Sequence, residues 1–345
     1  MIIKRPAAIL LAMLLAFLLL AGMLSGCDRT GPNERNSIIC TIFPQYDWVR
    51  QILGEKSDGF ELTLLLDNRI DLHSYQPSVS DIAKISSCDL FIYVGGESDG
   101  WVEEALKNAT NKDMVVINLM ETLGENVKTE EIVEGMQPEH DDDDDHDDNY
   151  DHDDDDDYDD HGDHGDHDYD EHVWLSLKNA QILCEAIADA LFTLDTKNAN
   201  EYRNNLTAYL SELSNLDADY KTVVDAASYK TLLFADRFPF RYLVDDYGIS
   251  YYAAFTGCSA ETEASFTTFV FLAQKMDELQ LPCVLVTESS DQSIARTVIE
   301  NTTTRNYKIC VLDAIQSVSS SDVQNGASYL SIMESNLETL KEALD

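Results

Sequence analysis

Basic residues are scarce in this chain of 345 residues. Only 23 lysines and arginines stand against 65 aspartates and glutamates, which gives a formal net charge of −42. Nucleic acids and anionic membrane surfaces are bound through basic patches, so this balance argues against both as partners. Histidine is restricted in another way: seven of the eight histidines lie between positions 140 and 172, and the eighth is His73.

Two common enzyme motifs are also missing. The chain has no His-Glu-x-x-His helix of a zinc protease and no phosphate-cradling glycine loop, and Gly95-Gly96 is too weak a signal for nucleotide binding. An extracellular zinc-dependent hydrolase is therefore the rival function class rather than the preferred one. A passive adhesin or acidic coat protein is a third class, but such a protein would not need a loop around His73.

The run from His140 to His172 consists almost entirely of aspartate, histidine, glycine and tyrosine. With so few aliphatic residues it cannot bury enough surface to offset its ordering entropy, so we expect a mobile loop over residues 137–171. Imidazoles beside carboxylates are ligands for divalent transition metals, which favours metal capture over a merely solvated spacer. The auxiliary ligands would be His140, His146, His152, His161, His164 and His167.

The amino terminus predicts export. Lys4 and Arg5 precede an apolar run over residues 7–24, and Leu24-Ser25-Gly26-Cys27 follows at once. This order indicates a signal peptide over residues 1–26 and resembles a bacterial lipobox, in which Cys27 would carry the lipid. A transmembrane anchor is the alternative, because the run is nearly long enough to span a bilayer. The lipidated protein would lie at the extracytoplasmic face of the bacterial membrane, with residues 27–36 as a tether.

Six further cysteines lie beyond Cys27, in a chain whose export would permit disulfides. Cys283 and Cys310 each sit in a short apolar run and could bridge neighbouring strands. Buried free thiols are an equally fair interpretation of the other four.

Apolar runs alternate with amphipathic stretches twice along the chain, which predicts α/β architecture with parallel sheets covered on both faces. We expect an N-terminal lobe over residues 37–196 and a C-terminal lobe over residues 228–345, both Rossmann-like. The predicted strands are Ile38–Phe43, Leu62–Leu66, Leu90–Val94 and Met114–Leu119, then Thr231–Phe234, Ile249–Ala254, Val284–Thr287 and Ile309–Leu312. The predicted helices are Tyr46–Leu53, Val79–Ile85, Val102–Ala109 and Leu175–Leu194, then Phe266–Leu279, Ser293–Asn301 and Tyr329–Leu344.

A linker over residues 197–227 would join the lobes. Within it, Ala199–Ala226 has apolar residues at helical spacing and neither glycine nor proline. A helix of this length would extend about 42 Å at 1.5 Å per residue. Such a rigid strut predicts only a small closure between the lobes.

Five stretches, spread in order along the chain, carry a family resemblance. They are Cys40-Thr41-Ile42-Phe43-Pro44 with Tyr46; Asp71-Leu72-His73-Ser74-Tyr75-Gln76-Pro77-Ser78 with Ser80-Asp81; Glu171-His172-Val173-Trp174-Leu175 with Lys178-Asn179-Ala180; Ser259-Ala260-Glu261-Thr262-Glu263-Ala264-Ser265; and Tyr329-Leu330 with Asn336-Leu337. Together with the Cys27 signal and the acidic histidine run, they resemble the metal-specific substrate-binding lipoproteins of bacterial ABC importers, the ZnuA/TroA-type zinc and manganese receptors.

The resemblance implies a ligand set drawn from both lobes. His73 and His172 match the first two ligands, and Asp313 matches the fourth. At the third position the family has a histidine or glutamate, whereas this chain offers Asp236, which aligns only with one inserted residue; otherwise Arg237 would fall there, and a guanidinium cannot ligate a cation. Glu261 or Glu263 could replace Asp236, although we expect them rather to orient the ligands through hydrogen bonds.

Two imidazoles with two carboxylates suit zinc, with manganese as the alternative, and the histidine-rich run favours zinc. The implied protein is a monomeric receptor and not an enzyme. It would capture the ion between its lobes and deliver it to an ABC permease, whose ATPase drives import. The acidic run could gather ions, sense scarcity or buffer, and the sequence does not choose among these roles.

Overall fold

The computed structural model describes residues 35–67, 70–136, 169–257 and 264–345 of the chain. Asn36–Asp345 forms one compact unit. Several predictions fall outside the described residues: the signal sequence with Cys27, the carboxylates Glu261 and Glu263, and the six auxiliary histidines between positions 140 and 167. No helix in the described ranges combines the length and the apolar character that a membrane span requires.

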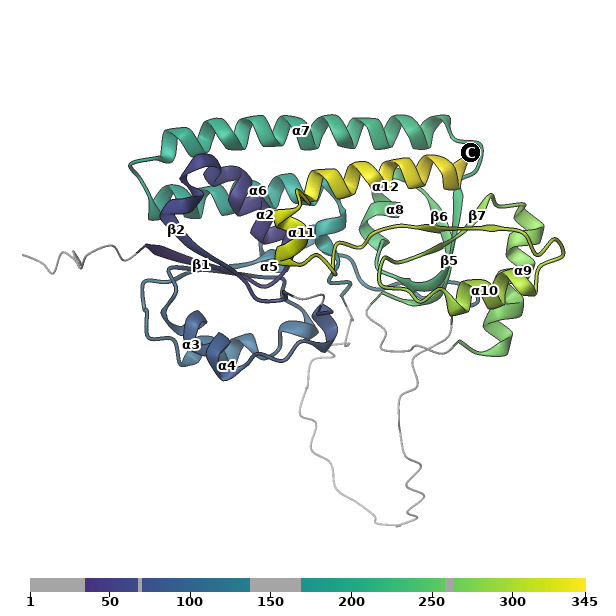
Figure 1. Cartoon of the computed structure of the whole chain (residues 1–345), viewed down its shortest axis with the longest axis horizontal. Helices are drawn as coiled ribbons and strands as arrows, with labels where there is room; N and C mark the ends of the chain where they lie inside the picture. Colours follow the sequence, from purple (N-terminus) through teal and green to yellow (C-terminus); the bar gives the residue numbers. More distant parts are fainter. Residues whose placement is uncertain (1–34, 68–69, 137–168, 258–263) are drawn as a thin grey trace, which may run out of the picture. The chain divides into compact units, whose positions relative to one another are not determined.

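The N-terminal lobe is built on a four-stranded parallel sheet. Its strands are β1 (Asn36–Cys40), β2 (Phe60–Leu64), β3 (Leu90–Tyr93) and β4 (Val115–Asn118), in the order β2-β1-β3-β4. The central strands are apolar on both faces, as a sheet covered on both sides requires. Helices α2 (Phe43–Leu53) and α6 (Leu177–Leu194) cover one face, and α3 (Val79–Ser87) and α4 (Val102–Lys107) lie on the other (Figure 1).

The C-terminal lobe repeats this order of strands. Its sheet is parallel, β6-β5-β7-β8, with β5 (Thr231–Phe238), β6 (Ser250–Thr256), β7 (Cys283–Val286) and β8 (Lys308–Val311). Helices α9 (Phe266–Leu279) and α10 (Ser293–Glu300) pack on this sheet, and α12 (Tyr329–Leu344) packs on it as well. In both lobes the carboxyl ends of the parallel strands lead into loops, which is where α/β proteins place their ligands.

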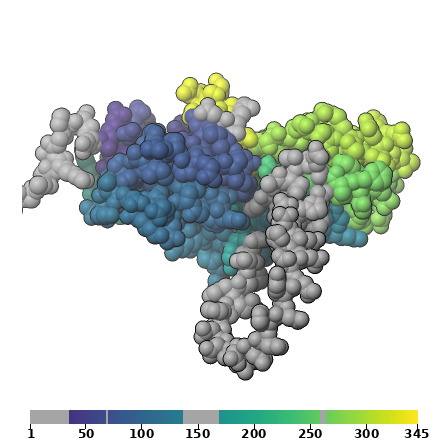
Figure 2. Space-filling model, turned by 90° about the horizontal axis from the view of Figure 1, so that it is seen from below, coloured from purple at the N-terminus to yellow at the C-terminus, as the bar shows by residue number. Residues whose placement is uncertain are grey.

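Helix α7 (Ala199–Ala226) runs along both lobes (Figure 1). Two other segments also join the lobes. The backbone N–H of Tyr329, at the start of α12, donates to Asp47 of α2 over 2.9 Å. The segment 127–136 lies against the C-terminal lobe, where Lys128 forms an ion pair with Asp245; its blue surface is visible beside the green of that lobe in Figure 2.

The predicted strands and helices are present, with shifts of a few residues at their ends. The α/β architecture with two parallel-sheet lobes is therefore confirmed. Three short helices were not predicted: α5 (Leu119–Leu123), α8 (Arg241–Tyr247) and α11 (Ser320–Gln324). Each spans only five to seven residues, too few to show a helical repeat.

The possible disulfide between Cys283 and Cys310 is not formed, because both residues are free thiols. The register of β7 with β8 pairs Cys283 with Lys308 and Cys310 with Leu285. The two cysteines are thus diagonal neighbours on adjacent parallel strands, and their thiols form a hydrogen bond with each other. Cys40, Cys88 and Cys184 are buried free thiols, as the alternative interpretation expected.

Candidate metal site

His73 lies on a short arm, Ile70–Tyr75, that follows β2. A single 3-10 turn, η3 (Leu72–Ser74), shapes the arm, and the buried side chain of Leu72 anchors it. Asp71 caps this turn, because its Oδ1 accepts the backbone N–H of His73 over 3.0 Å. The imidazole of His73 is left 14% exposed.

His172 comes from a different part of the chain and is fully buried. It precedes the 3-10 turn η6 (Val173–Leu175), and Asp170 binds it twice. The same Oδ1 atom of Asp170 accepts the backbone N–H of His172 at 2.9 Å and faces the ring Nδ1 at 3.0 Å. A carboxylate only accepts hydrogen bonds, so the proton of the neutral ring resides on Nδ1 and leaves Nε2 with a free lone pair.

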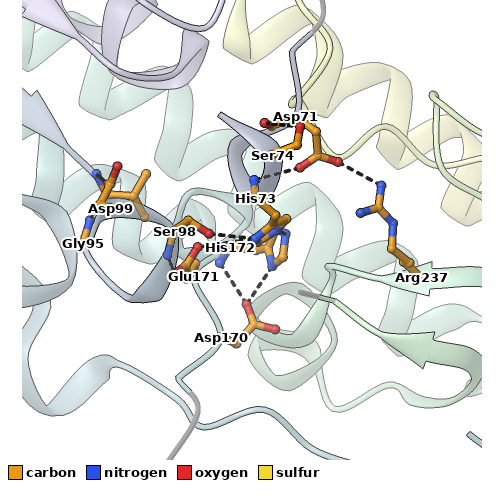
Figure 3. Close-up of polar contacts among 11 residues, drawn as sticks. Asp71, His73, Ser74, Gly95, Ser98, Asp99, Asp170, Glu171, His172 and Arg237 are labelled. Carbon is orange, nitrogen blue, oxygen red and sulfur yellow. Dashed lines mark hydrogen bonds and ion pairs between the residues drawn. The ribbon is translucent and has the colours of Figure 1, made fainter. Parts of the chain in front are cut away.

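The two imidazoles meet through their Nε2 atoms, which are 3.3 Å apart (Figure 3). The Nδ1 atom of His73 lies 2.8 Å from the hydroxyl of Ser98 and 3.5 Å from Oε2 of Glu171. Both rings are therefore held from behind by polar partners, an arrangement that orients histidine ligands toward a metal. The geometry leaves two ring nitrogens that can ligate a metal directed at one point.

The surroundings of the pair decide where protons bind. Burial, together with the neighbouring His172, lowers the pKa of His73 to about 3, so this ring is neutral at physiological pH. Burial also acts against the charged form of His172, but Asp170 outweighs it and raises the pKa of that imidazole. The proton that the pair takes up thus resides on His172, and a metal ion would have to displace it.

Behind His73 lies a buried carboxylate, Glu171, packed against the turn at Gly95 and Gly96. The backbone N–H of Ser98 donates to Oε1 of Glu171 over 2.8 Å. Gly96 has φ +81°, and a Cβ atom there would lie 2.4 Å from Oε1 of Glu171. Burial raises the pKa of Glu171, and it raises that of the nearby Asp99 to about 6.

In the C-terminal lobe, Asp236 lies within β5 and not after it. The pairing with β6 slips by one residue between Phe234 and Arg237, so a β-bulge accommodates the extra residue that the alignment requires. The Oδ2 atom of Asp236 accepts both the backbone N–H and the hydroxyl of Thr287, at 3.0 and 2.9 Å. Asp236 would have to give up these hydrogen bonds in order to bind an ion.

Arg237, the next residue, reaches across to the His73 arm. Its guanidinium donates to Oδ2 of Asp71 over 2.9 Å. Burial opposes the charge of Asp71, but Arg237 and His73 outweigh it and lower the pKa of this carboxyl below its ordinary value. In the described residues, the C-terminal lobe thus contacts the His73 arm through a cationic side chain and not through a metal ligand.

Asp313 follows β8 at the carboxyl end of the sheet, as predicted. Its Oδ1 accepts the backbone N–H of Ile315 over 2.7 Å, and Ile315 has φ +61°, a strained conformation for a β-branched residue. Burial, together with the nearby charge of Glu288, raises the pKa of Asp313 to about 7. Glu288 in turn accepts the backbone N–H of Ala314 over 2.8 Å.

Of the four predicted ligands, the structure brings together His73 and His172. Across the described ranges, no group of three or more histidine, cysteine, aspartate or glutamate side chains is arranged to hold a metal ion. Asp236 and Asp313 thus stay predictions for a state in which the second lobe contributes to the ion.

Sequence reasoning missed the residues that orient the two histidines. Asp170 could have been found as an acidic residue two positions before a proposed ligand. Ser98 also had a signal, because Gly96-Glu97-Ser98-Asp99-Gly100 matches the Gly-x-Ser-x-Gly spacing of hydrolase nucleophiles. The Asp71–Arg237 pair had no signal in the sequence, since only the fold brings these residues together.

Comparison with known proteins places the chain. Residues 38–343 match the family of the periplasmic component A of the zinc-uptake complex, ZnuA. The chain belongs to this family. It is 26% identical over 335 residues to the zinc-binding lipoprotein AdcA of Streptococcus pneumoniae strain R6, a match that covers 97% of this chain and 61% of AdcA. It is 28% identical over 311 residues to the high-affinity zinc uptake system protein ZnuA of Bacillus subtilis, covering 90% of this chain and 88% of that protein.

Solved structures of relatives have the same fold. The Zn(II)-bound AdcA of Streptococcus pneumoniae aligns with a TM-score of 0.67 at 25% identity, over 90% of this chain and 58% of AdcA. The metal-dependent lipoprotein YcdH of Bacillus subtilis aligns with a TM-score of 0.69 at 24% identity, over 90% of this chain and 99% of YcdH. This chain thus spans about three fifths of the length of the AdcA relatives and nearly all of YcdH.

Proposed function

We propose that this protein is a zinc receptor that binds one Zn²⁺ between its lobes. The observation that carries the proposal is the 3.3 Å separation of the Nε2 atoms of His73 and His172. Two nitrogens that each lie about 2.05 Å from one tetrahedral zinc are about 3.3 Å apart. The imidazoles are therefore already spaced for a shared ion.

The remaining ligands would come from the C-terminal lobe. Asp313 is the stronger candidate, because its half-buried carboxylate lies at a strand end beside Glu288, where a cation would relieve the repulsion between the two acids. Asp236 is the other candidate, after release of its hydrogen bonds to Thr287. Small movements of the second lobe would bring these oxygens to the ion.

Zinc is preferred over manganese because imidazole nitrogen is a better donor for zinc, whereas manganese prefers oxygen ligands. The relatives support the same choice: AdcA is named a zinc-binding lipoprotein, and the Bacillus subtilis protein belongs to a zinc uptake system. Manganese remains the alternative cargo within the same fold.

Delivery would follow capture. The family is described as a component of a zinc-uptake complex, and AdcA is named a lipoprotein, which supports an extracytoplasmic protein that works with an ABC permease and its ATPase. Cys27 would carry the lipid that holds the receptor at the membrane. The protein would act as a monomer, since both histidines of the site belong to one chain.

The hydrolase alternative has no support, because the family is one of uptake components and not of enzymes. Ser98 has the sequence spacing of a nucleophile, but it lies on the 3-10 turn η4 (Glu97–Asp99) and not at a strand-to-helix elbow. Its hydroxyl faces the Nδ1 atom of His73, whose pKa of about 3 makes it too weak a base to take a proton at neutral pH.

Isothermal titration tests the proposal. The protein beginning at Cys27 is titrated with Zn²⁺ and with Mn²⁺, with and without residues 137–168. We expect one tight site that survives the deletion and binds zinc more tightly than manganese. Loss of all tight binding upon deletion would place the site in the acidic run and contradict the assignment, and tighter binding of manganese would favour the alternative cargo.

A further inference from the structure

The two histidines of the site are attached to the C-terminal lobe in different ways. The segment around His172 is fixed to that lobe by buried hydrogen bonds. The hydroxyl of Tyr242, on α8, donates to the carbonyl of Asp170 over 2.7 Å, and the indole N–H of Trp174 donates to the carbonyl of Ala314 over 2.9 Å. His172 is therefore held against the C-terminal lobe from both sides.

The His73 arm and the residues before it are attached to the same lobe through side chains. At the arm itself, the attachment is the ion pair of Asp71 with Arg237. Before the arm, Asp67 accepts the backbone N–H and the hydroxyl of Ser320 at 2.8 and 2.7 Å. This second attachment fixes the approach to the arm, whereas the Asp71–Arg237 pair holds the turn that carries His73.

Little of either imidazole is open to solvent. The side chain of His172 is fully buried, and that of His73 is only 14% exposed. The side chains of Asp71 and Arg237 are more accessible, at 27% and 25%. Of the two histidines, His73 is the freer to move, because His172 is fixed by backbone hydrogen bonds on both sides.

We propose that Arg237 is a positioning residue that clasps the His73 arm through Asp71 and thereby sets how fast the ion enters and leaves the site. While the clasp is formed, Oδ1 of Asp71 holds the His73 backbone and Oδ2 is bound to the C-terminal lobe. Release of Arg237 lets the arm swing His73 away from His172 and opens a path to both Nε2 atoms. This inference rests on the proposed zinc site and concerns its kinetics.

Stopped-flow fluorescence on the full chain tests the clasp. Tryptophan fluorescence reports on this site through Trp174, whose ring lies 5.3 Å from that of His172. Association is measured with excess zinc, and dissociation with a chelator. We expect both Arg237→Met and Asp71→Asn to speed association and dissociation about tenfold, while the equilibrium affinity changes less than threefold.

The two substitutions separate a clasp from a simple charge effect. If Arg237 acted only by repelling cations, Arg237→Met would speed association, but Asp71→Asn would slow it, because a nearby negative charge is lost. Opposite effects of the two variants would therefore overturn the proposal, and so would unchanged rates. Arg237→Lys, which keeps the charge but not the planar guanidinium, should lie between wild type and Arg237→Met.

Lys308→Met is the matched control. Lys308 is a paired, exposed cation at the opposite end of the C-terminal sheet, so its loss should leave both rates unchanged. The wild-type titration distinguishes failure of the proposed zinc site from failure of the clasp. Absence of a single tight zinc site in the wild type would remove the proposed function itself, whereas a normal site with unaltered rates in the variants would remove only the clasp.

Discussion

At the scale of single residues, the site depends on which ring nitrogen of each histidine is free. Asp170 holds the proton of His172 on Nδ1, and Ser98 and Glu171 lie beside Nδ1 of His73. Both Nε2 lone pairs therefore face the space between the two rings. Without these partners the imidazoles could rotate or change tautomer, and the chain would have two histidines close together without a usable pair of donors.

Removal of the partner of His172 should weaken zinc binding. We expect Asp170→Ala to lower the affinity about 10–100-fold, the usual effect of losing such a carboxylate, with the stoichiometry unchanged. Asp170→Asn should lower the zinc affinity less than Asp170→Ala, because its amide oxygen can still accept a hydrogen bond from Nδ1–H of His172. Isothermal titration measures both variants, and Asp225→Ala, on the exposed face of α7, serves as the control. An Asp170→Ala protein with wild-type affinity would refute the role given to Asp170.

The buried Asp99 should make stability depend on pH. Its pKa is raised to about 6, above the value of about 3.9 in an unfolded chain, so the folded protein binds this proton more tightly. The stabilisation is complete below about pH 4 and is lost as the pH rises through 6, by about 2–3 kcal/mol.

Asp99→Asn should abolish this loss, since its amide oxygen can still accept the backbone N–H groups of Val94 and Gly95. Urea unfolding from pH 4 to pH 7 should show wild type losing stability relative to the variant. Exposed Asp113→Asn is the control. A constant difference between wild type and Asp99→Asn over this range would contradict the raised pKa.

At the scale of helices and strands, the sequence predicted what periodicity can report. Long amphipathic or apolar segments such as α7, α9 and α12 were predicted with the correct ends, because their patterns extend over several turns. The bulge in β5 was visible only as an alignment that needed one inserted residue near Asp236. Helix α8 was missed because seven residues make only two turns, although it carries Tyr242.

The candidate site was predictable only in part. His73 stood out as the lone histidine outside the acidic region, and His172 through the motif around it. Arg237 is different: the sequence allowed it to fall at a ligand position, but its pairing with Asp71, 166 positions away, depends on the packing of two lobes. Contacts between distant segments leave no local pattern in a single sequence.

Helix α8 should stabilise the fold through one hydroxyl. The Tyr242 hydroxyl accepts the backbone N–H of Lys128 at 3.0 Å and donates to the carbonyl of Asp170. Tyr242→Phe leaves one buried and one partly buried backbone group without this partner and should cost about 1–3 kcal/mol in the free energy of unfolding. Urea denaturation measures the loss. Tyr307→Phe, which removes a hydroxyl from a less buried site, should lower the free energy of unfolding by less. Equal losses of stability in the two variants would contradict the role of Tyr242.

At the scale of the whole compact unit, the lobes are joined more firmly than by one linker. Helix α7 spans them, α12 begins with a hydrogen bond to α2, and the segment 127–136 is held to the C-terminal lobe by ion pairs. These ties argue against a wide hinge motion and fit the small closure expected from a rigid strut. Movement near the two histidines would then involve short segments, chiefly the His73 arm.

The most direct test of the account is the position of the ion itself. Crystals of the zinc-loaded protein, with diffraction recorded at the zinc absorption edge, give an anomalous peak that marks each bound zinc. We predict one strong peak about 2.1 Å from the Nε2 atoms of both His73 and His172, with an Asp313 oxygen as a further ligand. A protein that binds zinc tightly but shows no peak between these two imidazoles would contradict the central claim.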